Sequence, residues 1–223
     1  MAIDRTRLRT NLEAVEERIA KACERAGRRR SEVTLVAVTK MVSPEVAALL
    51  PELGMLDLGE NRPQSLWHKA AMLPTEVHWH LIGHLQRNKI DKTLPMAHLI
   101  HAVDSVRLLQ AIEQEAVQQR RQVSVFLEVN ASGEASKQGF SPADLPGLAP
   151  ILRELQHVQV RGLMTMAALQ DPQACRPTFV TLRQLRDQLG LEQLSMGMSN
   201  DFEIAIEEGA TFIRLGTVLF EGV

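Results

Sequence analysis

This sequence has few aromatic side chains and no excess of positive charge. Tyrosine is absent from the 223 residues, and six phenylalanines and two tryptophans leave little surface on which nucleic-acid bases could stack. The 25 lysines and arginines stand against 27 aspartates and glutamates, and the net charge of −2 does not favour binding to a phosphate backbone. We therefore expect no nucleic-acid partner.

Cysteine and long apolar runs are scarce as well. Cys23 and Cys175 are too few for a disulfide framework, so nothing implies an oxidising compartment. No apolar run approaches the length of a membrane span, and the opening MAIDRTRLRTNLE is too charged for a signal peptide. These features predict a soluble cytoplasmic protein with no membrane partner, and 45% hydrophobic residues suffice for a sizeable core.

The first segment has a helical pattern. Its apolar residues recur at alternating spacings of four and three: Leu8, Leu12, Val15, Ile19 and Ala22. The run GRRR, residues 27–30, ends this helix, and we expect it to form a solvated loop rather than a phosphate contact.

Short apolar runs then alternate with amphipathic stretches. The predicted strands are Thr34–Val38, Met55–Leu58, Val77–Ile82, His98–Val103, Val123–Val129, Val158–Leu163, Leu194–Met196 and Phe212–Leu215. Helical patterns lie in the gaps, over residues 43–50, 106–119, 148–155, 177–189 and 201–209. Strand–helix alternation predicts parallel βαβ units, and eight such units predict an α/β fold of the closed (β/α)8 TIM-barrel type.

The two ends of the chain fit this barrel. Little sequence follows the eighth predicted strand, so we expect the extra N-terminal helix to close the ring in place of an eighth helix. No low-complexity linker or shift in composition divides the chain. We therefore predict a single domain over residues 1–223.

A lysine stands at the end of the first predicted strand. In a parallel barrel the functional site lies at the carboxyl ends of the strands, where Lys40 follows VAVT. A partly desolvated amine there loses affinity for its proton and becomes a nucleophile toward carbonyls. The alternative is a lysine that snorkels at a strand end, and position alone does not decide between the two.

Two loops at the same end of the barrel favour an anion. The loop SMGMS, Ser195–Ser199, precedes a predicted helix, and LGT, Leu215–Thr217, follows the eighth strand. Glycines let the backbone approach an anion, hydroxyls and helix-start amides can donate to it, and barrels often bind phosphate at these two loops. The alternative is two ordinary turns, with Ser199 or Asn200 capping the helix.

A charged residue, Arg214, interrupts the apolar eighth strand. It either points into the barrel or makes a structural ion pair. At the barrel mouth its fixed charge would disfavour protonation of a nearby ring nitrogen. Lysine, phosphate loops and arginine together suit pyridoxal 5′-phosphate (PLP), although an aldolase-type sugar phosphate site would also use lysine and phosphate.

Other polar residues have simpler interpretations. The spacing of His78 and His80 occurs in metal-dependent barrel hydrolases, but the later strand ends lack the further histidines and the carboxylate that such a site needs. We therefore expect no metal. Glu203, Glu207 and Glu208 are interpreted as the solvated face of a helix.

The order of these motifs is similar to that of a known family. The matching stretches, which span Leu35 to Phe220, are LVAVTK, LGENRPQ, VHWHLIGHLQRNK, HAVDS, EVNASGEASKQGF, RGLMTM and LSMGMSNDFEIAIEEGATFIRLGTVLF. They resemble the pyridoxal phosphate homeostasis protein family. The resemblance implies a PLP-binding barrel of fold type III, as in the amino-terminal half of alanine racemase.

The resemblance also implies which residues surround the cofactor ring. Lys40 would hold PLP as a Schiff base, and Arg214 would face the pyridine nitrogen. Asn61 would lie near the ring or its 3′-oxygen.

The phosphate group is assigned in the same way. The resemblance implies that Ser199, Gly216 and Thr217 hold it and that Ser195 is a neighbour of the site. All four residues come from the seventh and eighth strand ends described above.

The family resemblance implies a function as well. Its members are expected to buffer and deliver PLP, which affects amino-acid and keto-acid balance, without catalytic turnover. The alternative is a PLP-dependent amino-acid racemase, but racemases of this fold use a tyrosine base and an additional β domain, and this chain has neither. Arg214 opposite the ring nitrogen would also weaken the ring as an electron sink. We expect a monomer whose partners are PLP and, transiently, PLP-dependent apo-enzymes.

Overall fold

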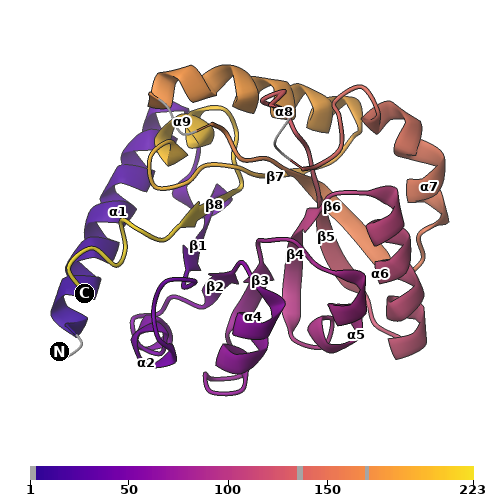
Figure 1. The fold of residues 1–223 in the computed structure, drawn as a ribbon. Coiled ribbons are helices and arrows are strands. Elements are labelled where there is room, and N and C mark those ends of the chain that lie inside the picture. Colours follow the sequence, from indigo (N-terminus) through magenta and orange to yellow (C-terminus); the bar gives the residue numbers. More distant parts are fainter. Residues whose placement is uncertain (1–3, 135–137, 169–170) are drawn as a thin grey trace.

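The strands form a closed ring that is surrounded by helices (Figure 1). The structure is a computed structural model that describes residues 4–134, 138–168 and 171–223. Three residues of the motif EVNASGEASKQGF, numbers 135–137, lie outside the described residues.

Eight parallel strands make the barrel. They are β1 (Thr34–Val38), β2 (Asp57–Glu60), β3 (His78–Leu81), β4 (Ala97–Val103), β5 (Val123–Glu128), β6 (Val158–Met164), β7 (Gln193–Ser195) and β8 (Phe212–Leu215). Each strand pairs in parallel with the next, and β1 pairs with β8 to close the ring, with Thr34 opposite Phe212 and Ala37 opposite Leu215. The predicted (β/α)8 fold is confirmed.

Helices occupy the connections between the strands. They are α1 (Arg5–Arg25), α2 (Pro44–Ala47), α3 (Leu49–Glu52), α4 (Pro63–Ala70), α5 (Ile90–Thr93), α6 (Val106–Gln119), α7 (Ala149–Glu154), α8 (Arg176–Gln188) and α9 (Phe202–Glu207). Short 3-10 turns add Arg30–Glu32, Arg87–Lys89, Leu145–Leu148 and Pro172–Cys175. In the described part of the chain no helix is long and apolar enough to cross a membrane.

Most predicted boundaries agree with these elements to within a residue or two. The limits of β1, α6 and β8 are those expected from the sequence. The second strand was placed wrongly: it runs over Asp57–Glu60 rather than Met55–Leu58. The predicted helix over residues 43–50 is two short helices, α2 and α3.

Apolar side chains pack in two separate clusters. The larger one fills the layer between strands and helices and includes Leu35 and Ala37 of β1. The smaller one consists of Leu99, Ala102, Phe126 and Met164, with Phe212 packed against it. The rings of Phe126 on β5 and Phe212 on β8 lie 5.4 Å apart, and because these strands are not neighbours, their side chains meet inside the barrel.

The N-terminal helix α1 completes the layer of helices around the barrel, as predicted. Asp4 caps it by accepting the N–H of Arg7 at 2.9 Å. The Nδ2 of Asn11 donates to the carbonyls of Leu219 and Glu221 at 2.9 and 3.0 Å, which holds the segment after β8 along α1 (Figure 1). No helix follows β8 among the described residues, so α1 takes the place of an eighth barrel helix.

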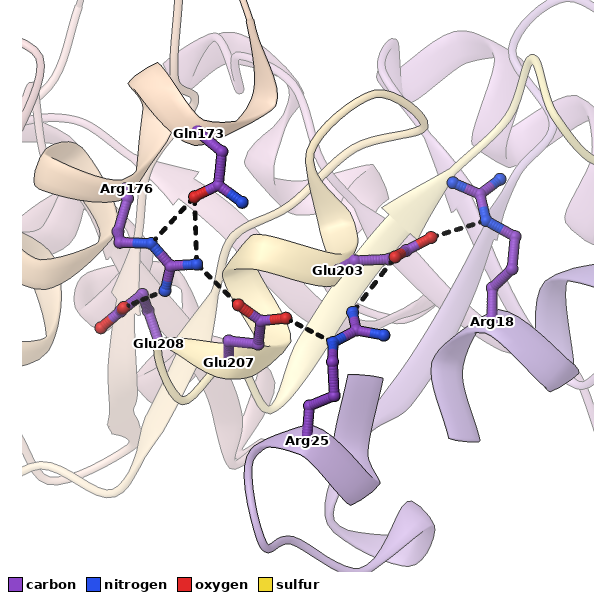
Figure 2. A network of polar contacts seen from close by, with 7 residues as sticks. All are labelled: Arg18, Arg25, Gln173, Arg176, Glu203, Glu207 and Glu208. Atoms are coloured by element: carbon purple, nitrogen blue, oxygen red, sulfur yellow. Dashed lines mark hydrogen bonds and ion pairs between the residues drawn. The ribbon is translucent and has the colours of Figure 1, made fainter. Parts of the chain in front are cut away.

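Ion pairs fasten α1 to α9 on the outside of the barrel (Figure 2). Arg18 contacts Glu203 at 2.7 Å, and Arg25 contacts both Glu203 at 3.2 Å and Glu207 at 2.8 Å. The same glutamates were predicted to form a solvated helix face. That prediction is wrong, because α1 packs against α9 and supplies their arginine partners.

The ion pairs continue from α9 to α8 (Figure 2). Arg176 contacts Glu207 at 2.6 Å and Glu208 at 2.5 Å, and Arg183 contacts Glu208 at 2.9 Å. Together with the pairs to α1 these contacts form one ionic network that spans three helices. We refer to it below as the ionic network.

The GRRR run is only partly the solvated loop that was expected. Arg30 binds Glu16 through two contacts of 2.8 Å, and Arg28 donates to the carbonyl of Ile206 at 2.8 Å. Of the three arginines, Arg29 is the exposed one. Two of the three arginines therefore make hydrogen bonds within the protein, Arg30 to α1 and Arg28 to α9, and do not simply face solvent.

Candidate functional site

Lys40 lies two residues beyond the end of β1, at the carboxyl end of the barrel. The residue is exposed, and no hydrogen bond or ion pair engages its amine among the described residues. The partial desolvation expected for this lysine is therefore not seen. Its amine is accessible to a carbonyl-bearing ligand, which a lysine buried in an ion pair would not be.

Arg214 is buried inside the barrel, with 4% of its surface exposed. Its Nη1 donates to the Oγ of Ser195 at 2.6 Å, and its Nη2 donates to the carbonyl of Thr165 at 2.9 Å. Of the two sequence-based alternatives, the inward orientation is the observed one. Burial lowers the pKa of Arg214 to about 10, against the opposing effect of the Asp201 and Glu128 carboxylates, so the group stays charged at neutral pH.

The loop after β7 is held tightly against both β8 and α9. The N–H of Arg214 donates to the carbonyl of Gly197 at 2.9 Å. Gly197 has a φ of +96°, and a Cβ there would lie 2.7 Å from the Cβ of Ala205, so a side chain at this position would clash. Glycine therefore brings this loop to the end of β8.

The helix cap in this loop is not the one considered from the sequence. Asp201, rather than Ser199 or Asn200, is the N-cap residue of α9, and its Oδ1 accepts the N–H of Met198 at 2.6 Å. Burial raises the pKa of Asp201, and that hydrogen bond and the charge of Arg214 oppose the rise. The Ser199 hydroxyl is thus not used in capping.

The two predicted phosphate loops have the chemistry that an anion needs. In the described part of the chain no hydrogen bond within the protein engages the hydroxyl of Ser199 or Thr217. In the second loop, Gly216 approaches β1 so closely that a Cβ would lie 3.1 Å from the carbonyl oxygen of Val38. Unused hydroxyl donors beside a backbone without a side chain fit a phosphate group.

A cavity of about 500 Å³ opens beside β2 and β3 at the same end of the barrel. Its lining residues are Asn61, Arg62, Pro63, Gln64, Ser65, His84, Gln86 and Lys89. Of the predicted site residues, Asn61 lines it. Glu60, next to Asn61, faces the other way and accepts hydrogen bonds from Lys69 and Thr39 at 2.6 and 2.7 Å.

Sequence reasoning missed Glu128, at the end of β5. Glu128 is 7% exposed. Burial raises the pKa of its carboxyl, and the charge of Asp104 adds to the rise, while the charge of Arg214 opposes it. The signal was present in the sequence, because a charged residue between Leu127 and Val129 interrupts an apolar strand in the same way as Arg214 does.

Sequence reasoning also missed the buried His101 of β4. The neighbours of this side chain depend on the register between strands, which the sequence pattern does not give.

Ser195 is not at the surface of the site. It is fully buried and contacts Arg214 and His101, at 2.6 and 2.7 Å from its Oγ. Ser195 therefore contacts the buried guanidinium of Arg214 and is not accessible in the way that a loop residue at the barrel mouth would be.

The two histidines considered as metal ligands are both engaged by one carboxylate. The Oδ1 of Asp57 lies 3.3 Å from the Nδ1 of His78 and 3.0 Å from the Nε2 of His80. Across residues 4–134, 138–168 and 171–223, no group of three or more His, Cys, Asp or Glu side chains could hold a metal ion.

The sequence matches known proteins over almost its whole length. Residues 8–222 match the family described as alanine racemase, N-terminal domain. The chain is 43% identical over 217 residues to a pyridoxal phosphate homeostasis protein of Aquifex aeolicus (strain VF5), which covers 94% of this chain and 95% of that protein. A protein of the same name from Pseudomonas aeruginosa is 39% identical over 217 residues, covering 94% and 93%.

Solved structures agree with these sequence matches. PipY of Synechococcus elongatus PCC7942, solved with PLP bound, superimposes with a TM-score of 0.80 at 35% identity and covers 92% of this chain and 99% of its own. An alanine racemase from Clostridium difficile 630 superimposes with a TM-score of 0.74 at 15% identity, covers 96% of this chain and 56% of its own, and shows the fold alone. With an alanine racemase N-terminal domain over residues 8–222 and relatives up to 43% identical, the chain belongs to the pyridoxal phosphate homeostasis protein family.

Proposed function

We propose that this protein binds pyridoxal 5′-phosphate and acts in PLP homeostasis inside the cell, where it buffers the cofactor and delivers it. The observation that carries the proposal is an accessible lysine after β1 at the same end of the barrel as unused hydroxyl donors in the loops after β7 and β8. The names of its relatives and the PLP-bound structure of PipY support the same ligand. Through cofactor supply the protein would affect amino-acid and keto-acid balance.

Six of the seven predicted site residues contact the cofactor in this proposal, and Ser195 contacts Arg214 instead. Lys40 would hold the aldehyde carbon covalently, Arg214 would face the ring nitrogen, and Asn61 would lie beside the ring. Ser199 and Thr217 would donate to the phosphate, and Gly216 would leave room for it. When bound, PLP supplies an aldehyde that amines can attack and a ring that withdraws electrons.

The same residues favour carriage of the cofactor over turnover. Arg214 is a charged donor and keeps its own protons, so it does not supply a proton to the ring nitrogen. The chain holds no tyrosine that could act as a second base. We propose a non-catalytic, monomeric protein of the cytoplasm that uses residues 1–223 as one unit and contacts PLP-dependent apo-enzymes transiently.

The first experiment locates the covalent link. Protein loaded with PLP is reduced with borohydride and digested, and the pyridoxyl group is mapped by mass spectrometry. We expect it on Lys40, and we expect Lys40→Ala to lose it, while Lys92→Ala, which removes a lysine that packs over the Trp67 ring, keeps it on Lys40. An adduct on a different lysine, or none in loaded protein, would overturn the assignment.

The second experiment tests the phosphate loops. Ser199→Ala and Thr217→Ala should each weaken PLP binding about tenfold or more, since a charge-assisted hydrogen bond contributes roughly 1.5–3 kcal/mol. Binding of pyridoxal, which lacks the phosphate, should change little. Equal losses for both ligands would mean that these residues shape the barrel and do not hold the phosphate.

The third experiment separates delivery from catalysis. Loaded protein is incubated with a PLP-stripped enzyme, and separately with several L-amino acids, and reactivation and D-isomer formation are measured. We expect reactivation without racemisation. Robust racemisation that disappears in Lys40→Ala would replace the carrier function with an enzymatic one.

A further inference from the structure

A continuous chain of hydrogen-bonding side chains crosses the inside of the barrel behind Arg214. Ser195 Oγ lies 2.6 Å from Arg214 Nη1 and 2.7 Å from His101 Nδ1. The Nε2 of His101 lies 2.9 Å from the Nδ1 of His80, and the Nε2 of His80 lies 3.0 Å from the Oδ1 of Asp57. We refer to these five residues as the interior chain.

The interior chain runs from one end of the barrel to the other. Arg214 and Ser195 lie near the carboxyl ends of β8 and β7, whereas Asp57 is the first residue of β2. The serine and both histidines are 0% exposed. Asp57 is partly exposed, so the chain meets solvent at the amino-terminal end of the barrel, opposite the candidate site.

The two ends of the chain fix the direction of every hydrogen bond within it. A guanidinium can only donate, and a carboxylate can only accept, so the proton between His80 and Asp57 lies on His80 Nε2. The Nδ1 of neutral His80 must then accept from His101 Nε2, and His101 Nδ1 must accept from the Ser195 hydroxyl. One arrangement of protons accounts for all four hydrogen bonds of the interior chain.

The histidines are held neutral by their surroundings. Burial lowers the pKa of His101 well below its ordinary value, and the charge of Arg214 acts in the same direction. Burial also lowers the pKa of His80, although Asp57 opposes the shift. The pKa of Asp57 is lowered in spite of its burial, because His80 and His78 stabilise its charge.

We propose that Ser195, His101, His80 and Asp57 are positioning residues for Arg214. The carboxylate at the far end orders the two imidazole tautomers, and the ordered serine hydroxyl then holds one arm of the guanidinium while the carbonyl of Thr165 holds the other. These two hydrogen bonds fix the orientation of the guanidinium, and so they fix the direction of the N–H groups that they leave unused. The consequence for PLP rests on the proposed function, whereas the ordering of the tautomers does not.

The first test needs no cofactor. Histidine labelled with 15N is incorporated, and two-bond H–N correlations assign the ring tautomers at about pH 7. We expect both His80 and His101 to carry the proton on Nε2. In Asp57→Asn the new amide can donate to His80, so we expect His101 to lose its single tautomer although it does not touch residue 57. A wild-type His101 protonated on Nδ1, or a His101 tautomer unchanged in Asp57→Asn, would overturn the proposal.

The second test compares the same substitution at two histidines of β4. His101→Phe keeps a ring to pack edge-on against Phe126, whose centroid lies 4.9 Å away, but breaks the interior chain. His98→Phe is the matched control, because His98 stacks on His78 at 4.7 Å and lies outside the chain. We expect PLP affinity to fall about tenfold in His101→Phe, with a shifted absorption maximum, and to stay within about twofold in His98→Phe.

The outcomes separate this inference from the proposed function. A wild-type protein that does not bind PLP would reject the proposed function and leave the tautomer result standing. PLP binding that is equal in wild type and in His101→Phe would reject the positioning role. If His101→Phe fails to fold, Asp57→Asn takes its place, with a several-fold loss of PLP affinity expected and an unchanged affinity contradicting the proposal.

Discussion

The ionic network on the outside of the barrel and the interior chain within it both join elements that lie far apart in the sequence. The network uses full charges on side chains that range from partly exposed, at 43% and 31% for the pair Arg18 and Glu203, to mostly buried, at 9% for Glu208. The interior chain uses two charges separated by three neutral, fully buried groups. Water can replace a lost partner in the network, but it cannot reach the middle of the interior chain. A neutral hydroxyl inside the barrel should therefore contribute more to stability than a carboxylate of the ionic network.

The largest effect is expected for Ser195→Ala. Loss of this hydroxyl leaves Arg214 Nη1 and His101 Nδ1 buried without a partner, and at roughly 1–3 kcal/mol for each group we expect a loss of about 3 kcal/mol in the free energy of unfolding. Urea unfolding of the ligand-free protein measures it. Ser199→Ala is the control, with about 0.5 kcal/mol or less expected, and equal losses for the two variants would remove the distinction drawn above.

The next effect is a dependence of stability on pH. His80 and His101 have lowered pKa values in the folded state, so below about pH 6.5 the unfolded chain binds more protons than the folded one, and stability falls as the pH falls. Each histidine contributes up to about 1.4 kcal/mol per pH unit. We expect the slope between about pH 5 and pH 6.5 to decrease by nearly one proton in His101→Phe.

Urea midpoints at several pH values measure that slope. Glu128 and Asp201, whose pKa values are raised by burial, act with the opposite sign. A slope that is the same in wild type and His101→Phe would show that the buried histidine titrates in the folded state as freely as in the unfolded one.

A smaller effect is expected in the ionic network. Glu207 contacts both Arg25 and Arg176, and Glu207→Gln should cost about 1 kcal/mol at low ionic strength. About 1 M NaCl should remove most of this cost, because the screening length falls to roughly 3 Å. Glu24→Gln, at an exposed glutamate without an ion pair among the described residues, is the control. Salt should leave the cost of Ser195→Ala unchanged, and a parallel response of both variants would contradict the comparison.

The smallest effect is expected for a single pair of the network. A double-mutant cycle between Arg18→Met and Glu203→Gln should give a coupling free energy of about 0.5 kcal/mol, as for other exposed pairs. Arg18 also lies over the ring of Phe202, 4.6 Å from its centroid, and that contact cancels in the cycle. A coupling free energy above about 2 kcal/mol would mean that this pair contributes as much as a buried interaction and would contradict the expectation.

The barrel could be predicted from the sequence because apolar runs alternate with amphipathic stretches along almost the whole chain. The error at β2 has a physical cause. Met55 and Leu56 continue the apolar run, but the strand itself contains Asp57, which faces His80, and Glu60, which pairs with Lys69. An apolar pattern cannot locate a strand whose inner and outer faces both bind polar side chains.

The site could be predicted only in part for a related reason. Lys40, Gly216 and Thr217 follow single strand ends, so their place at the barrel mouth follows from topology alone. The partners of His101 depend on the register between strands, which shifts within both the β3–β4 and the β4–β5 pairs. The glutamate partners in the ionic network depend likewise on how α1 crosses α9, which no local pattern encodes.

The pairing of β1 with β8 has a consequence for how the protein forms. A nascent chain that has emerged only as far as β7 has two open sheet edges, and such edges invite pairing with other chains until Phe212–Leu215 arrives. The same strand delivers Arg214, without which the Oγ of Ser195 lacks its donor. Sheet closure and completion of the interior chain are therefore one event during synthesis, and a partly made chain cannot hide its sheet edges.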